Sequence, residues 1–508
     1  MEQTAPVGVD EAGGPAALYR RRAEWFADAR DGCQRRWNLV ANLRLAAFLV
    51  AAAWVWWAYH LWAVWPLALA GVGFAAFLAL ARYHGRLGRA RRRFDELRAV
   101  NVEAGWRLAR AWDDLPLRHE FQAAPGHAYA ADLDIFGRAS LLHLLQPSST
   151  SMGEAALRDW LLAPAALETI AARQAAAGEL AGRIDLRDEL QAQARLAGDA
   201  RPDPEPFLAW AEGAPWLRPQ RALLWAARFS PVFVWVTLAL WLAGVVPYPL
   251  WLAGLLANGV LWRVLGRRAR ETVGRVAAQE GAFRHYAGSF AALAGVTFEA
   301  PELARLAADL TADGRPAAEQ MRRLARSGRF VVPPSASAYS LLQYLCLWDL
   351  WVLAALEGWQ LAAGRHARRW LAALGAIEAL AAFGGLAHAQ PAWCFPTVAR
   401  GAEAVTARDL AHPYLADDVR VANDVAVGPA GTFLLVTGSN MAGKSTLLRA
   451  LGVNLALAGA GGPVCARAFQ TPPVRLWTSM RVQDSLAGGV SYFMAELQRL
   501  KAVVQAAD

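Results

Sequence analysis

Residues 433–451, FLLVTGSNMAGKSTLLRAL, decide the fold of the C-terminal part of the chain. The apolar run 433–437 predicts a short buried strand, and the residues after the loop, 447–451, predict a helix. The loop between them fits G-x-x-x-x-G-K-[ST], in which backbone N–H groups surround phosphates and the helix N-terminus adds partial positive charge. We therefore predict a C-terminal α/β domain that binds the phosphates of a nucleotide. The predicted binding residues are Gly438, Ser439, Asn440, Met441, Ala442, Gly443, Lys444, Ser445 and Thr446.

Two residues of this loop have specific predicted tasks, and together they predict ATP and Mg²⁺ as the cofactors. Lys444 is expected to contact the β- and γ-phosphates, and the Ser445 hydroxyl is expected to hold Mg²⁺. Lys444 and Lys501 are the only lysines of the chain, although Lys and Arg together number 52. One of two lysines thus stands where phosphate chemistry requires it, which argues against a chance match.

Two long apolar runs, 45–81 and 229–262, contain no Asp, Glu, Lys or Arg. As a single helix the first run would measure about 55 Å, whereas the hydrocarbon core of a bilayer is about 30 Å thick. Each run has prolines near its middle, Pro66 in the first and Pro247 with Pro249 in the second. Prolines at such positions indicate turns. We therefore predict two transmembrane helical hairpins, each with two short crossings.

The residues that flank these runs predict the topology. Arginines stand on both sides of each run, so each run is expected to cross an even number of times and to return to the cytoplasm. Tryptophans crowd the first turn, where an interfacial aromatic belt would lie. The alternative is a pair of buried hairpins in a soluble protein. The flanking arginines are Arg35, Arg36, Arg44, Arg82, Arg86, Arg89, Arg91, Arg92, Arg93, Arg228, Arg263, Arg267, Arg268 and Arg270.

A third apolar stretch, 341–361, contains Asp349 and Glu357. An ionised carboxylate in the middle of a bilayer costs at least about 2.5 kcal/mol, so this stretch is interpreted as a helix packed against protein. Residues 94–120 and 271–330 have helical spacing, and the proline-rich segments 202–219 and 331–335 are expected to be connections.

Composition excludes several classes of protein. Apolar residues make up 56% of the 508 residues, so the chain is not intrinsically disordered. Its four cysteines lie far apart, without a C-x-x-C pair, which excludes a disulfide scaffold and a cysteine zinc site. The net charge of +9 comes almost entirely from arginine and is not by itself a nucleic-acid signature.

At this point the sequence resembles a known family. The segment 437–446, TGSNMAGKST, resembles the phosphate loop of MutS, the DNA mismatch-repair ATPases, whose Asn-Met pair generic loops lack. The segment 491–497, SYFMAEL, resembles the S-T-F-M-x-E-M segment of that family. Further similar segments are His412 to Leu415, Asn423 with Asp424, 132–137, 140–142 and 170–180. With the two hairpins, the resemblance points to the membrane-spanning, MutS-related branch of bacteria.

The resemblance implies a further set of sites and partners. The segment 486–491 would be the signature loop of an ABC-type ATPase, in which Gly488, Gly489 and Ser491 cap the γ-phosphate bound by the other subunit. A homodimer with two composite ATP sites is therefore implied, as is binding to mismatched or branched DNA. The implied location is the bacterial inner membrane, multi-pass, with the ATPase domain and both termini in the cytoplasm.

We accordingly expect an α-rich multidomain membrane protein. The predicted divisions are 1–38, an N-terminal cytoplasmic segment; 39–82, the first transmembrane hairpin; 83–227, a helical region that begins a MutS-like core; 228–263, the second hairpin; 264–400, the continuation of the helical core and lever; and 401–508, an incomplete P-loop ATPase domain.

The sequence departs from the family pattern in three respects. In the family, the carboxylates that bind Mg²⁺ and orient water follow the S-T-F-M-x-E helix, whereas no strand ending in such a pair is found here, and Asp508 follows no strand. The complete protein is therefore expected to hydrolyse ATP, and the chain as written is expected to bind ATP without hydrolysing it. The mismatch-reading N-terminal domain of the family is also missing. Phe94 and Glu96 match the short mismatch-reading motif but are interpreted as part of a juxtamembrane helix. Arg420 or Val421 stands where an adenine-stacking aromatic is common in the family.

Two other functions remain open. An ABC transporter would also combine membrane spans, a phosphate loop and a Gly-Gly signature, but it would have a helical subdomain between Lys444 and Gly488. It would also need polar residues in its spans beyond His60 and Asn258. A nucleotide-gated membrane protein that does not hydrolyse ATP is the second alternative.

Overall fold

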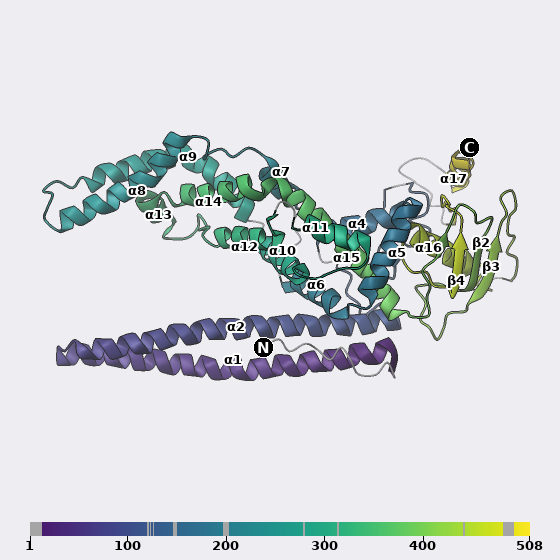
Figure 1. Ribbon diagram of the computed structural model, residues 1–508, viewed down its shortest axis with the longest axis horizontal. Helices are drawn as coiled ribbons and strands as arrows, with labels where there is room; N and C mark the ends of the chain where they lie inside the picture. The colour runs from purple at the N-terminus through teal and green to yellow at the C-terminus, as the bar shows by residue number, and fades with distance from the viewer. Residues whose placement is uncertain are drawn as a thin grey trace.

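The computed structural model describes residues 13–118, 121, 123–124, 126–145, 150–196, 203–277, 280–311, 314–439, 442–480 and 492–507. The molecule is elongated and helix-rich (Figure 1). Two helical hairpins project toward one end of the long axis, a helical core fills the middle, and a small sheet with α16 lies at the other end. The predicted α-rich fold class is confirmed, and the C-terminal part contains a small sheet in addition.

The first hairpin consists of α1 (Gly14–Leu61) and α2 (Trp65–Ala109), which pack against each other along their length. At 48 and 45 residues they measure about 72 and 68 Å. The turn lies at Trp62 to Val64, and Pro66 occupies the first turn of α2, where its missing N–H costs little. The predicted turn is thus in place. The helices, however, run far beyond the predicted 39–82, and α2 ends before the predicted limit of 120, because the 111–118 segment leaves the helical path.

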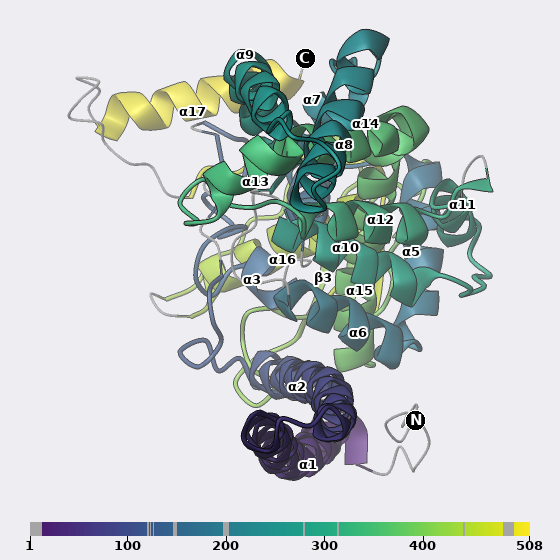
Figure 2. The same cartoon turned by 90° about the vertical axis from the view of Figure 1, so that its left-hand side faces the viewer.

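The second hairpin consists of α8 (Arg221–Leu242) and α9 (Trp251–Ala277), and its turn contains the predicted prolines. Figures 1 and 2 place the tips of the two hairpins at the same end of the molecule, with the helical core between their bases. Exposed large apolar side chains gather on both tips; they include Trp62, Val64, Val72, Leu242, Val245, Tyr248 and Leu256. Two segments far apart in sequence therefore present apolar surface toward the same side.

In the part of the chain that the structure describes, four helical segments are long and apolar enough to cross a membrane. In α1, α2 and α8 only 11%, 11% and 22% of the most apolar window is buried by protein, whereas 72% is buried in the fourth, Trp348–Ala389. The fourth therefore has protein neighbours in place of solvent or lipid. Helix α9, expected as the return crossing, is not among the four.

The helical core accounts for most of the buried apolar side chains. One cluster centres on Phe283, Trp359 and Trp370, and a second joins the core to the C-terminal sheet through Leu133, Phe383 and Val453. The core helices are α3 (Leu141–Leu145), α4 (Ser151–Leu162), α5 (Leu167–Ala181), α6 (Ile184–Leu196), α7 (Glu205–Glu212), α10 (Glu280–Leu293), α11 (Pro301–Asp309), α12 (Ala317–Gly328), α13 (Tyr339–Cys346), α14 (Trp348–Ala363) and α15 (Ala367–Ala389). Helix α7 lies inside 202–219, which was expected to be a connection throughout.

The packing of 341–361 against protein is confirmed by the partners of its two acids. The predicted single helix, however, is divided, because α13 ends at Cys346 and α14 begins at Trp348, with Leu347 between them in a left-handed conformation at φ 50°. Asp349 is buried and accepts a hydrogen bond from the Tyr339 hydroxyl. The buried carboxylate of Glu357 accepts hydrogen bonds from the backbone N–H groups of residues 216, 217 and 218, each at 2.7 Å. Glu357 thus supplies hydrogen-bond acceptors for the segment that leads into α8, whose N–H groups at these positions have no helical partner.

The first hairpin is attached to the core by a buried ion-pair network. Arg22 of α1, 1% exposed, donates to Asp185 at 2.7 Å and to Asp188 at 2.9 Å, both on α6. Asn101 of α2 accepts from Arg22 Nε at 3.3 Å and donates to Asp188 at 2.7 Å. One guanidinium therefore links three helices.

The C-terminal sheet has the strand order β1-β4-β2-β3, with β1 (Thr397–Val398) parallel to β4 (Ala468–Thr471) and β2 (Val405–Leu410) antiparallel to both β4 and β3 (Asn423–Val427). Thr406 of β2 lies opposite both Gln470 and Ala426. Helices α16 (Lys444–Ala460) and α17 (Tyr492–Ala507) complete this region.

The prediction of a buried strand at 433–437 is wrong for the described structure. This segment has no strand hydrogen bonding, and Phe433, Leu434 and Leu435 are 84%, 45% and 74% exposed. A strand exists only when a neighbouring strand takes up its backbone groups. Among the described residues none does so, and apolar composition alone does not create a strand.

Replacement of Glu357 by leucine should lower the free energy of unfolding by about 3 kcal/mol, because buried N–H groups lose their acceptor. Glu357→Gln retains one carbonyl acceptor and should cost roughly half as much. Thermal unfolding of the purified chain measures both. The control is Glu319→Gln, which breaks an exposed i,i+4 pair with Arg323 and should cost less than about 1 kcal/mol. Equal effects at the two sites would contradict this role of Glu357.

Candidate phosphate-binding site

The predicted phosphate loop leads directly into the N-terminus of α16. Gly443 precedes the helix with φ +80°, a left-handed conformation that strains any residue with a Cβ. The first helical hydrogen bond runs from Leu447 N to Gly443 O at 2.9 Å. Among the described residues no side chain caps the helix, so the N–H groups of its first turn have no side-chain acceptor there. An uncapped helix N-terminus of this kind favours an anion.

Lys444 folds back over its own loop. Its Nζ donates to Gly438 O at 2.5 Å and to Ser439 O at 2.6 Å. The ammonium group is therefore held beside the helix N-terminus by carbonyls, which are replaceable acceptors. A phosphate at this position would take over these hydrogen bonds and add charge attraction.

The structure brings most of the predicted loop together and leaves several predicted residues untested. Gly438 and Ser439 contact Lys444 through their carbonyls, Gly443 directly precedes α16, and Ala442, Ser445 and Thr446 are exposed. Asn440 and Met441 of the loop, Gly488, Gly489 and Ser491 of the predicted signature loop, and Asp508 all lie outside the described residues.

Asn454, in the middle of α16, is a structural residue of the site that the sequence analysis missed. It is fully buried; its Nδ2 donates to Ala411 O at 3.1 Å and its Oδ1 accepts from Cys465 N at 2.6 Å. The side chain thus ties the helix to two chain segments beside the sheet. The sequence signal was an asparagine within an otherwise apolar helix, which is costly unless its amide is bonded.

The segments that resemble MutS around residues 132 and 412 meet at α16. A Cβ on Gly452 would lie 2.8 Å from Leu133 Cδ2, so glycine permits this close packing. The Tyr414 hydroxyl lies 3.0 Å from Leu133 O and 3.1 Å from Asp134 O. Asp132 accepts from Thr478 Oγ1 at 2.7 Å. Residues between 280 and 346 positions apart therefore pack together beside α16.

Arg420, at the position of the adenine-stacking aromatic, and Phe94, in the match to the mismatch-reading motif, both have structural partners nearby. Arg420 pairs with Asp417 at 3.0 Å and lies over the ring of Trp393, while the neighbouring Val421 is exposed. Phe94 packs in the hairpin against the rings of Trp25 and Phe26. Phe94 is therefore part of the packing between α1 and α2 and is not presented as a wedge.

No cluster of three or more His, Cys, Asp or Glu side chains that could hold a metal occurs in the ranges that the structure describes. The donor that fits Mg²⁺ at the phosphate loop is the Ser445 hydroxyl, which needs phosphate oxygens and water to complete an octahedral shell. The loop therefore fits a Mg²⁺ that arrives with a nucleotide, since its own oxygens do not form a cage.

Comparison with known proteins agrees with this location. Residues 434–508 match the family model "MutS domain V". The DNA mismatch repair protein MutS of Chlorobaculum tepidum is 35% identical over 139 residues, and that of Chlorobaculum parvum is 34% identical over 139 residues. In both cases the match covers 26% of this chain and 16% of the relative. The C-terminal part of the chain is thus similar to the MutS family.

Removal of the Asn454 amide should loosen the base of α16. Asn454→Ala leaves the buried Cys465 N–H without an acceptor, which should lower the free energy of unfolding by about 2–3 kcal/mol. The matched control is Asn423→Ala, at an exposed position, with an expected change within about 0.5 kcal/mol. Chemical denaturation compares the two, and equal stabilities would refute the structural role of Asn454.

Proposed function

We propose that the chain is a membrane-anchored, MutS-related protein that binds ATP with Mg²⁺ at the phosphate loop before α16. The observation that carries the proposal is the match of residues 434–508 to MutS domain V, on the segment where the uncapped helix N-terminus, Gly443 and Lys444 come together. Any one of these features is common; their coincidence is typical of a nucleotide site.

In this proposal three parts of the loop bind the nucleotide and its metal: the backbone N–H groups of the first helical turn, Lys444 and Ser445. Backbone N–H groups of the first turn of α16 bind phosphate oxygens, and Lys444 exchanges the carbonyls of Gly438 and Ser439 for the β- and γ-phosphates. The exposed Ser445 hydroxyl binds Mg²⁺ together with those phosphates. The metal would neutralise phosphate charge.

The two hairpins are proposed to anchor the protein in the bacterial inner membrane. The apolar arms of the first hairpin, 45–61 and 65–81, measure about 26 Å each, close to a bilayer core of about 30 Å. Those of the second, 229–242 and 251–262, measure about 21 and 18 Å. We propose that the first hairpin crosses most of the bilayer and the second enters less deeply. Both helices of each hairpin then return to the cytoplasmic side.

Three features support the membrane assignment. The tips of both hairpins lie at the same end of the molecule, so one bilayer can receive both. Their apolar side chains are largely exposed in the protein alone. The alternative of buried soluble hairpins requires protein neighbours that cover the most apolar windows, and only 11%, 11% and 22% of these windows in α1, α2 and α8 are buried in the described structure.

A homodimer, DNA binding and, in a form of the protein that carries the hydrolytic carboxylates, ATP hydrolysis are proposed by similarity to MutS. The relatives are DNA mismatch repair proteins. By this similarity the residues around 488 would complete the ATP site of a second copy, and mismatched or branched DNA would be the partner of the helical core.

Nucleotide binding is tested through the two lysines of the chain. Lys444→Ala should weaken the binding of a fluorescent ATP analogue with Mg²⁺ by at least about tenfold, since a charge-assisted contact contributes about 1.5–3 kcal/mol. Lys501→Ala, at an exposed position on α17, is the matched control and should bind as the wild type does. Wild-type affinity in the Lys444 variant, or no binding by the wild type, would refute the proposed site.

Membrane anchoring is tested by placing arginine on the tips. Val72→Arg and Leu256→Arg, at positions 68% and 71% exposed, should each oppose insertion, with a cost of up to about 2.5–3.5 kcal/mol at the bilayer centre. The fraction that resists alkaline extraction of membranes should fall, most of all in the double variant. Val421→Arg, equally exposed but in the sheet region, should have no effect. Complete extraction of the wild type would contradict the anchor.

A further inference from the structure

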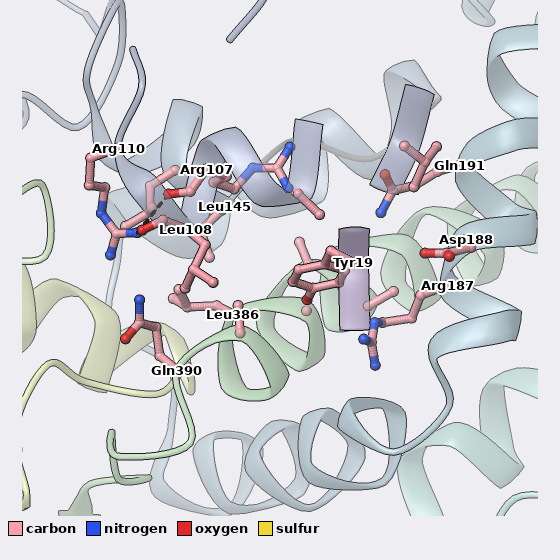
Figure 3. A pocket seen from close by; sticks show the side chains of 17 residues that line it. Tyr19, Arg107, Leu108, Arg110, Leu145, Arg187, Asp188, Gln191, Leu386 and Gln390 are labelled. Carbon is pink, nitrogen blue, oxygen red and sulfur yellow. Dashed lines mark hydrogen bonds between the residues drawn. The ribbon is translucent and has the colours of Figure 1, made fainter. Parts of the chain in front are cut away.

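A cavity of about 40 Å³ lies where the first hairpin meets the helical core. It is far from the hairpin tips and separate from the phosphate loop. Arg107 and Arg110, at the end of α2, line one part of it, and Gln390, after α15, lies nearby (Figure 3). Tyr19, Arg187 and Asp188 line the rest. On this measure one water needs about 10–15 Å³, so the cavity has room for about three water-sized groups.

Several hydrogen-bond donors of this cavity have no acceptor among the described residues. Arg110, 7% exposed, uses Nε on Pro413 O at 2.8 Å and Nη1 on Arg107 O at 2.7 Å, which leaves Nη2 unpartnered. The Nε2 of Gln390, 3% exposed, and the Nε and Nη2 atoms of Arg107 are likewise buried and unpartnered. In Figure 3 the guanidinium of Arg110 and the amide of Gln390 point toward one another. Donors that face each other require an acceptor between them.

Positive charge at the cavity exceeds the negative charge that faces it. Arg107, Arg110 and Arg187 all line the cavity, and Asp188 is the only acid among its lining residues. That carboxylate is already bonded to Arg22 and Asn101. Glu103, the nearest further acid to act on Arg107, is bonded to Arg118 and Arg195. On its other side Arg110 faces Arg420 and Asp417, which pair with each other.

Burial makes this arrangement costly without a counter-ion. Loss of hydration lowers the pKa of Arg107 to about 10 and that of Arg110 to about 10, so both remain charged at neutral pH. Arg187, the third arginine of the cavity, already has acceptors, because it donates to Leu180 O and Ala181 O at the C-terminal end of α5. A buried charge with no partner is strongly unfavourable, whereas a charge-assisted bond to an oxyanion restores the lost interaction.

We propose that this cavity is a binding site for one small oxyanion of the phosphate class, held by Arg110 and the Gln390 amide, whose unpartnered donors face each other. An oxyanion offers acceptor oxygens to both donors at once. The cavity is too small for a nucleoside, so the anion binds free and not as part of a nucleotide. Bound there, it joins the end of α2, the end of α15 and the 412–414 segment that enters the sheet region.

The test uses the full chain with Lys444→Ala, which removes phosphate binding at the loop of α16 and so separates the two sites. Inorganic phosphate is titrated by equilibrium dialysis, and thermal unfolding is followed at constant ionic strength with chloride as the reference anion. The expected result is saturable binding of one phosphate per chain and an unfolding temperature that rises with phosphate concentration.

Two variants examine the site itself. Arg110→Gln should abolish saturable binding and the phosphate-dependent rise. Gln390→Glu supplies a built-in carboxylate for Arg110, so it should abolish phosphate binding yet unfold at a higher temperature than its parent in chloride. This second variant remains informative if the first fails to fold. Arg92→Gln on the same helix and Gln505→Glu on α17, both at exposed positions, are the matched controls and should bind phosphate as the parent does.

Four results would overturn the proposal. The first is an unfolding temperature that depends on ionic strength alone, because the cavity then holds water only. The second is unchanged phosphate binding in both Arg110→Gln and Gln390→Glu, because the anion then binds elsewhere. Competition by ADP in the Lys444→Ala background would overturn the assignment to a free oxyanion. A lower unfolding temperature of Gln390→Glu in chloride would show that the Gln390 carbonyl already satisfies Arg110.

Discussion

The buried guanidinium of Arg22 is the interaction on which the arrangement of the molecule depends. Helices α1 and α2 are long enough to swing independently, and their contact with the core near the Arg22 network determines where their tips lie. Arg22 bonds Asp185 and Asp188 of α6, and Asn101 of α2 bonds the same Asp188. Because a carboxylate left alone at this depth would be expensive, the three side chains fix one register of the hairpin on α6. The relative position of the two tips follows from that register.

The same network explains why the chain uses arginine at its buried junctions. A planar guanidinium makes several directed hydrogen bonds and loses less hydration energy than an ammonium on burial. Arg22 and Arg110 each bond acceptors from two different segments while they are buried. Arg187 bonds two carbonyls at the end of α5, and Arg195 of α6 bonds both carboxylate oxygens of Glu103 on α2. Lysine, a compact and strongly hydrated charge, suits a position where it must exchange partners. Lys444, beside the loop carbonyls, is in such a position.

Sequence predicted those features that depend on local chemistry. The proline turns, the burial of 341–361 and the start of α16 were correct because each follows from a few neighbouring residues. The strand at 433–437 was wrong because strand formation depends on a partner, which an apolar pattern does not report. The lengths of α1 and α2 were underestimated because their polar halves are stabilised by contacts with α6 and with each other. The bonding partners of Asn454 and the junction of residues 132–134 with 412–414 involve segments distant in sequence, so a local pattern could mark Asn454 as unusual but could not identify these contacts.

Two helical rods connect the phosphate loop with the hairpin tips, and they constrain how the ends can move. One is the first hairpin; the other is the 42-residue segment Trp348–Ala389, which consists of α14, a 3-10 turn at Gly364–His366 and α15, and runs from beside residues 231–236 of α8 to Gln390. The latter is 72% buried in its most apolar window, so bending it would expose packed side chains. Relative movement of the ends must therefore occur where the rods terminate. Both rods end at the cavity of Arg110 and Gln390, so the charge balance at that junction bears directly on how firmly the sheet region is held to the hairpins.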